Sequence, residues 1–206
     1  MALRGERLRE HILWTAKDVF IELGFERTSM DVVAARAKTS KRSLYAHFEN
    51  KDKLFGAVMT LVRELYLGKL LRTPAEYGDD PAEAIARFCG RLLQVQLWNS
   101  ALRTLRLGIA EAERLPGVAA EYYESIFEIP QQRLADFVVE RYGVDTGAAH
   151  EIAQRLLGRA VYPVLIGALL GVGEPLAERP EESTLETDVD LEPLRAAVAA
   201  LLPPLR

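Results

Sequence analysis

Apolar side chains recur at helical spacing along most of this chain, beginning close to its N-terminus. The segment LREHILWTAKDVFIELGF predicts an amphipathic helix that stops at Gly24. Its apolar face is formed by Ile12, Leu13, Ala16, Val19, Phe20 and Leu23. A second, two-turn helix is expected in TSMDVVAARA, with Thr28 as N-cap and Asp31 three residues later. A third short helix, KRSLYAHF, follows Lys38 and Thr39 and is capped by Ser40.

The helical pattern continues to the C-terminus. A fourth helix begins at Asn50 and runs to the breaker at Thr73 and Pro74. Further helices are expected at roughly 81–97, 101–113, 117–142, 145–171 and 191–202, and residues 172–190 are expected to form an exposed connector. No segment has the alternation typical of a strand, so the predicted fold class is all-α.

Charge is distributed unevenly between the two parts of the chain. The net charge of the 206 residues is −4. Residues 1–55 carry 11 Lys or Arg against 8 Asp or Glu, a net charge of +3, whereas residues 56–206 carry 15 against 22, a net charge of −7. The basic part is suited to binding a polyanion, and the acidic part disfavours unspecific binding of the protein to such a polymer.

Two short helices joined by a tight turn have the form required to enter the major groove of DNA. Side chains near the N-terminus of the second helix reach base edges there, and Lys or Arg donates to guanine. The candidates for base contacts are Lys41, Arg42 and Ser43. The candidates for phosphate contacts are Thr28, Lys38, Ser40, Tyr45, His47 and Lys51.

Residues 7–55 resemble the DNA-binding domain of the TetR (tetracycline repressor-like) family. The resemblance rests on Gly24-Phe25, on Thr28-Ser29-Met30 and on SKRSLYAHFENKDKLF from Ser40. It implies an N-terminal three-helix helix-turn-helix domain at 1–55 and a C-terminal helical domain for ligand binding and dimerisation at 56–206. It also implies phosphate contacts for Tyr45, His47 and Lys51, and a groove position for residues 41–43.

The turn between the two short helices departs from the family pattern, which usually has a glycine there. Lys38 occupies that position, and lysine adopts the left-handed conformation at a cost of about 1 kcal/mol relative to glycine. Either the turn differs from the usual one, or Lys38 adds a phosphate contact.

The C-terminal part offers an apolar surface for a second copy of the chain. Two helices from each of two copies can form a four-helix interface, and the alternative is that the same residues fill an intramolecular core. The expected interface residues are Ile152, Leu156, Val161, Val164, Leu165, Leu169, Leu194, Val198 and Leu201.

Aromatic and polar side chains between residues 81 and 142 can line a cavity for a small-molecule effector. They are Phe88, Trp98, Arg103, Tyr122, Tyr123 and Phe127, each of which can instead belong to the core. The effector itself has no sequence signature.

No pattern supports catalysis, a metal or a cofactor. His150-Glu151 is followed by Gln154 where a zinc protease needs its second histidine. One cysteine, Cys89, suits a reducing compartment, and the most apolar stretch, 160–173, is too short for a membrane span.

We therefore expect a cytoplasmic homodimer, not an enzyme, that binds an operator duplex as a ligand-responsive repressor. The alternative is a helical module whose basic surface binds a protein or membrane partner.

Overall fold

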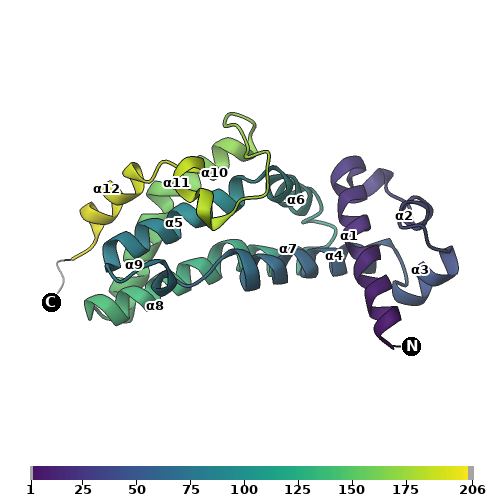
Figure 1. Ribbon diagram of the computed structural model, residues 1–206, viewed down its shortest axis with the longest axis horizontal. Helices are drawn as coiled ribbons and strands as arrows, with labels where there is room; N and C mark the ends of the chain where they lie inside the picture. Colours follow the sequence, from purple (N-terminus) through teal and green to yellow (C-terminus); the bar gives the residue numbers. More distant parts are fainter. Residues whose placement is uncertain (1, 204–206) are drawn as a thin grey trace. The chain divides into compact units, whose positions relative to one another are not determined.

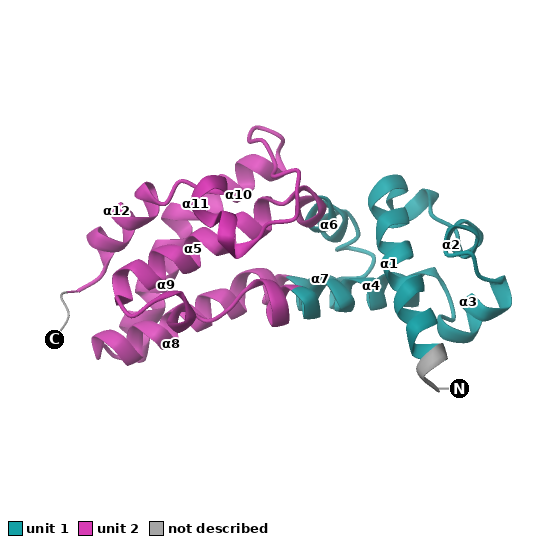
Figure 2. Cartoon of the chain, viewed as in Figure 1, with its two compact units in different colours: residues 1–65, 103–122 teal, residues 66–102, 123–206 magenta. Residues whose placement is uncertain are grey.

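The computed structural model describes residues 2–203, with side chains from residue 5 onward. Helices follow one another along these residues (Figure 1), and in the described part of the chain the β-type pairing is a single isolated bridge between Trp98 and Leu176. The predicted all-α class is therefore confirmed. The chain forms two compact units (Figure 2): unit 1 takes residues up to 65 and 103–122, and unit 2 takes 66–102 and 123 onward.

Unit 1 contains the N-terminal helices and a later segment of the chain. Its helices are α1 (Ala2–Arg27), α2 (Met30–Arg36), α3 (Lys41–His47), α4 (Lys51–Leu65), most of α6 (Asn99–Ala110) and nearly all of α7 (Pro116–Tyr123). The core centres on three aromatic rings: Phe20 and Phe25 stack at 5.8 Å, and Phe55 meets them edge-on at 5.2 and 5.4 Å. These contacts fix α1 against α4, because large buried aromatic rings dominate the energetics of a small core.

The helical backbone of α1 is interrupted at Gly24, the residue at which the first helix was expected to stop, although the element extends to Arg27. Gly24 has φ 77° and ψ 168°, which interrupts the helical geometry, but one further turn continues to Arg27. Only glycine adopts this conformation without strain, so the residue redirects the chain toward α2.

Unit 2 is built around α5 (Pro81–Leu97), which is buried on nearly all sides. A helix buried on all sides forms the centre of a core rather than its edge. Around it lie η1 (Tyr66–Leu70), η2 (Pro74–Tyr77), η3 (Glu124–Glu128), α8 (Ile129–Tyr142), α9 (Thr146–Ala160), α10 (Tyr162–Leu169), η4 (Glu182–Thr184), α11 (Leu185–Asp188) and α12 (Glu192–Leu201). Of these, η1 and η3 are π-helical turns and η2 and η4 are 3₁₀ turns.

Buried polar side chains of α5 bind the end of η1 and the segment before α12. Arg91 donates to the carbonyl of Leu70 at 3.0 Å and to the Gln94 side chain at 2.5 Å. Gln94 in turn donates to the carbonyl of Glu181 at 2.9 Å and to Asp188 at 2.6 Å. Because both side chains are 5 % exposed or less, these partners compensate for the loss of their hydration.

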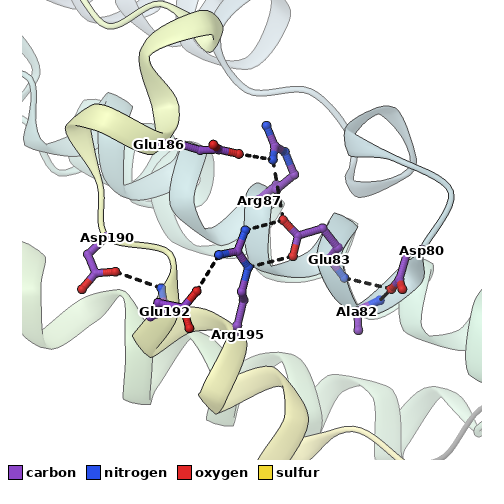
Figure 3. Close-up of polar contacts among 8 residues, drawn as sticks. All are labelled: Asp80, Ala82, Glu83, Arg87, Glu186, Asp190, Glu192 and Arg195. Carbon is purple, nitrogen blue, oxygen red and sulfur yellow. Dashed lines mark hydrogen bonds and ion pairs between the residues drawn. The ribbon is translucent and has the colours of Figure 1, made fainter.

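An ion-pair network joins α5 to α12 (Figure 3). Arg195 donates to both carboxylate oxygens of Glu83, at 2.9 and 2.8 Å, and to Glu192 at 2.7 Å. Arg87 extends the network to Glu186 of α11 at 2.6 Å. The two-pronged contact of Arg195 sets the orientation of α12 on α5, since both N–H groups must align with one carboxylate.

Two expectations for this part of the chain are wrong. The expected helix 145–171 is broken at Val161, where α9 ends before α10 begins with Pro163 in its first turn. Proline lacks the N–H that would continue the hydrogen-bond ladder, so the helix is interrupted two residues before it. The expected exposed connector 172–190 contains η4 and α11, and it buries Leu185 and Val189.

A membrane span is not formed by any one helix of the described residues, because none combines sufficient length with sufficient apolar character. The bent pair α9 and α10, which meet at 41°, passes the same criteria only when taken together.

Candidate nucleic-acid interface

The helix-turn-helix is fixed by two serine caps. Ser29, rather than the expected Thr28, caps α2 by accepting a hydrogen bond from the Val32 amide at 3.2 Å. Thr28 is buried, and its hydroxyl donates to the carbonyl of Gly24 at 2.7 Å. Ser40 caps α3 as expected, accepting from the Ser43 amide at 3.1 Å. Each cap satisfies a helix amide that would otherwise lack a partner.

The turn between α2 and α3 places Lys38 in the left-handed region, with φ 50°. The Lys38 amide donates to the carbonyl of Ala35 at 3.2 Å, and the Thr39 amide donates to that of Ala34 at 3.0 Å. These two bonds form a Schellman motif, the usual helix ending for which glycine is preferred. Lysine therefore occupies a regular turn at some conformational cost, and the turn itself does not differ from the usual type.

One face of α3 is exposed and the other is packed in unit 1. Leu44 and the following Phe48 are buried, whereas Lys41 and Arg42 are exposed and Tyr45 is 50 % exposed. The packed face orients the helix, which leaves the first-turn cations in solvent. This is the arrangement that a recognition helix requires.

The two cations at the start of α3 differ in their partners. The Lys41 ammonium forms an ion pair with Asp31 of α2 at 2.6 Å, with both side chains exposed. Arg42 has no hydrogen bond or ion pair with any residue that the structure describes. An uncommitted guanidinium can turn toward a guanine edge without losing an existing partner, so Arg42 is the better placed of the two.

Other expected contact residues lie around this helix in different environments. Ser43 is half-buried and accepts a hydrogen bond from the Ser40 hydroxyl at 3.0 Å. His47 is half-buried beside Phe48, with ring centroids 6.3 Å apart. Lys51 donates to the carbonyls of Phe25 and Glu26 at 2.9 and 3.3 Å, so its ammonium supports the end of α1.

Arg36 of α2 is also paired, with Glu22 of α1. One of its nitrogens donates to a Glu22 oxygen at 2.8 Å, and the hydrogen bond from Arg36 lowers the pKa of that carboxyl. The pair therefore remains ionised at neutral pH and withdraws one cation from the basic surface.

Arg114 belongs to this unit although sequence reasoning did not identify it. Its guanidinium lies over the Phe25 ring, 3.5 Å from the centroid, while the Lys51 ammonium lies 4.1 Å from the same centroid. Arg114 also pairs with Asp52 at 2.5 Å and with Glu111 at 2.9 Å. Arg114 and Asp52 are 62 positions apart in the sequence, and no periodicity at that distance would have revealed the contact.

The expected effector-site residues are divided between the two units. In unit 1, Arg103 is exposed and donates to the carbonyl of Ile21 at 2.8 Å, and Tyr122 is buried. In unit 2, Phe127 packs against Tyr123 at 5.0 Å. Of the remaining two residues in unit 2, Phe88 is buried in α5 and Trp98 is half-buried.

The expected dimer residues are likewise of two kinds. Five are buried within the chain itself, which is the intramolecular alternative raised by the sequence: Leu156, Val161, Leu165, Leu194 and Val198. Val164 is 48 % exposed, and Ile152, Leu169 and Leu201 are partly exposed. Three further apolar side chains are also exposed on and after α10: Ile166, Leu170 and Val172.

Comparison with known families identifies both parts of the chain. The model of the family "Bacterial regulatory proteins, tetR family" matches residues 12–58. The model "AefR-like transcriptional repressor, C-terminal domain" matches residues 83–191, which is more than half of the chain.

Individual relatives agree with these matches. The chain is 32% identical over 167 residues to an HTH-type transcriptional repressor of Mycobacterium tuberculosis, covering 79% of this chain and 78% of the relative. It is 26% identical over 206 residues to the HTH-type transcriptional regulator TcmR of Streptomyces glaucescens, covering 97% and 83%. A TetR-family structure from Mesorhizobium loti superimposes with a TM-score of 0.78 at 25% identity, covering 96% of both chains. The chain therefore belongs to the TetR family of DNA-binding transcriptional regulators, which are not enzymes.

Proposed function

We propose that this regulator is a repressor that binds a two-fold symmetric operator as a homodimer and leaves it when a small-molecule effector binds. It acts in the cytoplasm, on the bacterial chromosome. The observation that carries the proposal is the exposed first turn of α3, where Arg42 is uncommitted while the opposite face is locked into unit 1. The predicted base contacts are those of Lys41, Arg42 and Ser43, and the predicted phosphate contacts come from residues 28–51, on either side of them in the sequence.

The experiment that tests operator binding starts from a pool of random duplexes. Bound sequences are selected and sequenced, and the best duplex is titrated with the wild type, with Arg42→Ala and with Arg155→Ala at two salt concentrations. Arg155 is an exposed arginine of α9 and serves as the matched control. We expect a palindromic motif, a loss of discrimination of about 1–3 kcal/mol in Arg42→Ala, and no change in the control.

The alternative function makes a different prediction in the same experiment. If the basic surface serves a protein or membrane partner, the selected pool shows no enriched motif, and binding to any duplex is weak and depends only on salt. That outcome would reject the repressor proposal and favour the alternative.

The homodimer is supported by the exposed apolar side chains on and after α10. Val164, Ile166, Leu170 and Val172 are 48, 54, 76 and 84 % exposed, and we call them the α10 surface. Apolar side chains gathered in one short segment indicate a protein contact more often than isolated ones do. A second copy of the chain is the proposed occupant, because two half-sites require two recognition helices about 34–36 Å apart.

An organic effector is supported by one relative of known structure. A solved protein described as the "Flavonoid-responsive Regulator FrrA" superimposes with a TM-score of 0.66 at 27% identity, covering 96% of this chain. We propose that an effector bound in unit 2, beside the paired rings of Tyr123 and Phe127, favours a state of the dimer that cannot contact both half-sites at once. A dimer that contacts one half-site instead of two loses most of its affinity for the operator. A modest shift in the populations of the dimer's states is therefore enough to release the DNA.

A further inference from the structure

A polar groove of about 590 Å³ opens on the surface of unit 2. It lies where η1 leads into η2, with one side formed by Arg133 of α8. Small-molecule sites commonly have volumes of about 300–1,000 Å³. The groove therefore has room for an organic molecule, and none of the residues expected at the effector site lines it.

The charge of the groove is opposite to that of the part of the chain that contains it. Lys69, Arg72 and Arg133 line the groove together with one acidic residue, Glu76, whereas residues 56–206 as a whole carry a net charge of −7. A concave surface lined with basic side chains has a positive electrostatic potential that attracts anions, even in an acidic part of the protein. Such a local excess of cations does not follow from composition.

Arg133 is held in position before any ligand arrives. Its two terminal nitrogens donate to the carbonyls of Leu71 at 2.6 Å and Leu67 at 3.3 Å, at the end of the π-helical turn η1. A guanidinium has five N–H groups, and these two bonds leave others for an acceptor in the groove. The ordering cost of binding is lower when the cation is already fixed.

The acidic side chains at the groove do not block an anion. Glu76 accepts from the amide and the hydroxyl of Thr73, both at 2.9 Å, so its carboxylate is turned toward its own capping box. Arg72 pairs with Glu182 at 3.3 Å, and both side chains are largely exposed. An exposed ion pair of this type contributes at most about 1 kcal/mol, so an incoming anion can replace Glu182.

We propose that this groove binds a small organic anion through a carboxylate or phosphate group, which contacts Lys69, Arg72 and Arg133. The apolar remainder of the ligand lies against the half-buried Leu67. The proposal concerns a site separate from the DNA-binding surface and from the expected effector residues. It holds or fails without reference to operator binding.

The test uses three ligands that share one ring and differ in the head group: benzoate, phenyl phosphate and the neutral benzamide. Each is titrated into the ¹⁵N-labelled full-length protein without DNA, and dissociation constants are read from the amide and arginine Nε–H chemical shifts of residues 67–73, 75, 76 and 133. We expect both anions to bind more tightly than benzamide and to weaken as salt is added. The ratio between benzoate and phenyl phosphate identifies the preferred head group.

Variants separate the groove from unspecific binding. The double variant Lys69→Gln, Arg72→Gln is expected to weaken anion binding about tenfold, because each exposed cation contributes up to about fivefold. Arg72→Lys keeps the charge and retains most of the affinity. Arg155→Gln is the control, since Arg155 is also an exposed arginine paired with a glutamate but does not line the groove. Equal binding of benzamide and the anions, or equal loss in the control, would overturn the proposal.

Discussion

At the scale of single residues, Lys38 shows how a sequence can depart from its family without changing the backbone. The Schellman motif requires a left-handed residue, and lysine adopts φ 50° there. The amides of Lys38 and Thr39 still make both bonds of the motif. The hydrogen bonds of the motif and the helix caps on either side thus determine the backbone of the turn, and Lys38 adopts the left-handed conformation that this backbone requires.

We expect Lys38→Gly to raise the free energy of unfolding by about 1 kcal/mol, because glycine enters the left-handed region without steric cost. Urea unfolding followed by circular dichroism measures this change. Lys38→Asn serves as a control that tolerates the conformation and also removes the charge. If Lys38 contacts a phosphate, both variants lose operator affinity equally, whereas unchanged affinity would assign the residue to the turn alone.

Cys89 permits a second test at the residue scale. It is 1 % exposed in α5, and burial raises the pKa of its thiol to about 12. Because the thiolate is the reactive form, we expect the native protein not to react with Ellman's reagent at about pH 8. One thiol per chain should appear after unfolding in urea. Rapid reaction of the native protein would instead show that unit 2 opens around α5.

At the scale of helices, the link between α5 and α12 depends on ionisation. The hydrogen bonds from Arg195 lower the pKa of Glu83 below its ordinary value of 4.5. A carboxyl with a lower pKa in the folded state stabilises the fold at pH values above 4.5, and this contribution is lost as pH falls through the folded pKa. Attachment of α12 is therefore expected to weaken in acid.

Glu83→Gln tests this dependence. We expect the variant to be less stable than the wild type at neutral pH and the difference to shrink at an acidic pH below the folded pKa of Glu83, where the wild-type carboxyl is protonated as well. Urea denaturation at both pH values measures it. Glu151→Gln is the matched control, because its pair with Arg155 is exposed at both ends. A difference that persists in acid would show that Glu83 acts through packing instead.

Sequence patterns predicted helices well where one strong stripe lay between clear breakers. The range 81–97 agrees with α5, because Asp80 and Pro81 start that helix and its apolar residues recur at helical spacing along its whole length. The sequence patterns failed where the regular α-helical backbone is interrupted within an apolar stripe. The spacing of apolar residues does not distinguish η1 and η3 from α-helix. A π-helical turn contains one more residue than an α-helical turn, but it is built from the same types of residue. Leu185 and Val189 were missed because two buried positions in a short polar segment give little periodicity.

The helix-turn-helix residues followed from sequence because they lie within one local segment. Their partners did not. The pairing of Lys41 with Asp31 and the contact of Lys51 with the end of α1 arise only after the helices pack. The sequence does not rank Arg42 above the other two candidates for base contacts. The structure does, because Arg42 has no partner among the described residues.

At the scale of the whole molecule, the proposed dimer can be tested on two isoleucines of similar exposure. Ile166 of the α10 surface is 54 % exposed, and Ile109 of α6 is 60 % exposed. We expect Ile166→Asp to produce a monomer in sedimentation velocity, because a buried unpaired carboxylate opposes association, and Ile109→Asp to leave the dimer intact. A dimer that survives Ile166→Asp would place the interface elsewhere.

The composition of unit 1 has a consequence for hybrid regulators assembled from different relatives. A graft that joins a new N-terminal segment at residue 55 or 65 would retain residues 103–122 from the other parent. The transplanted segment would then have to offer a carboxylate to Arg114, an aromatic face beneath it and a carbonyl to Arg103, as Asp52, Phe25 and Ile21 do in this chain. Exchange of DNA specificity therefore requires the segment 103–122 to travel with its recognition helix.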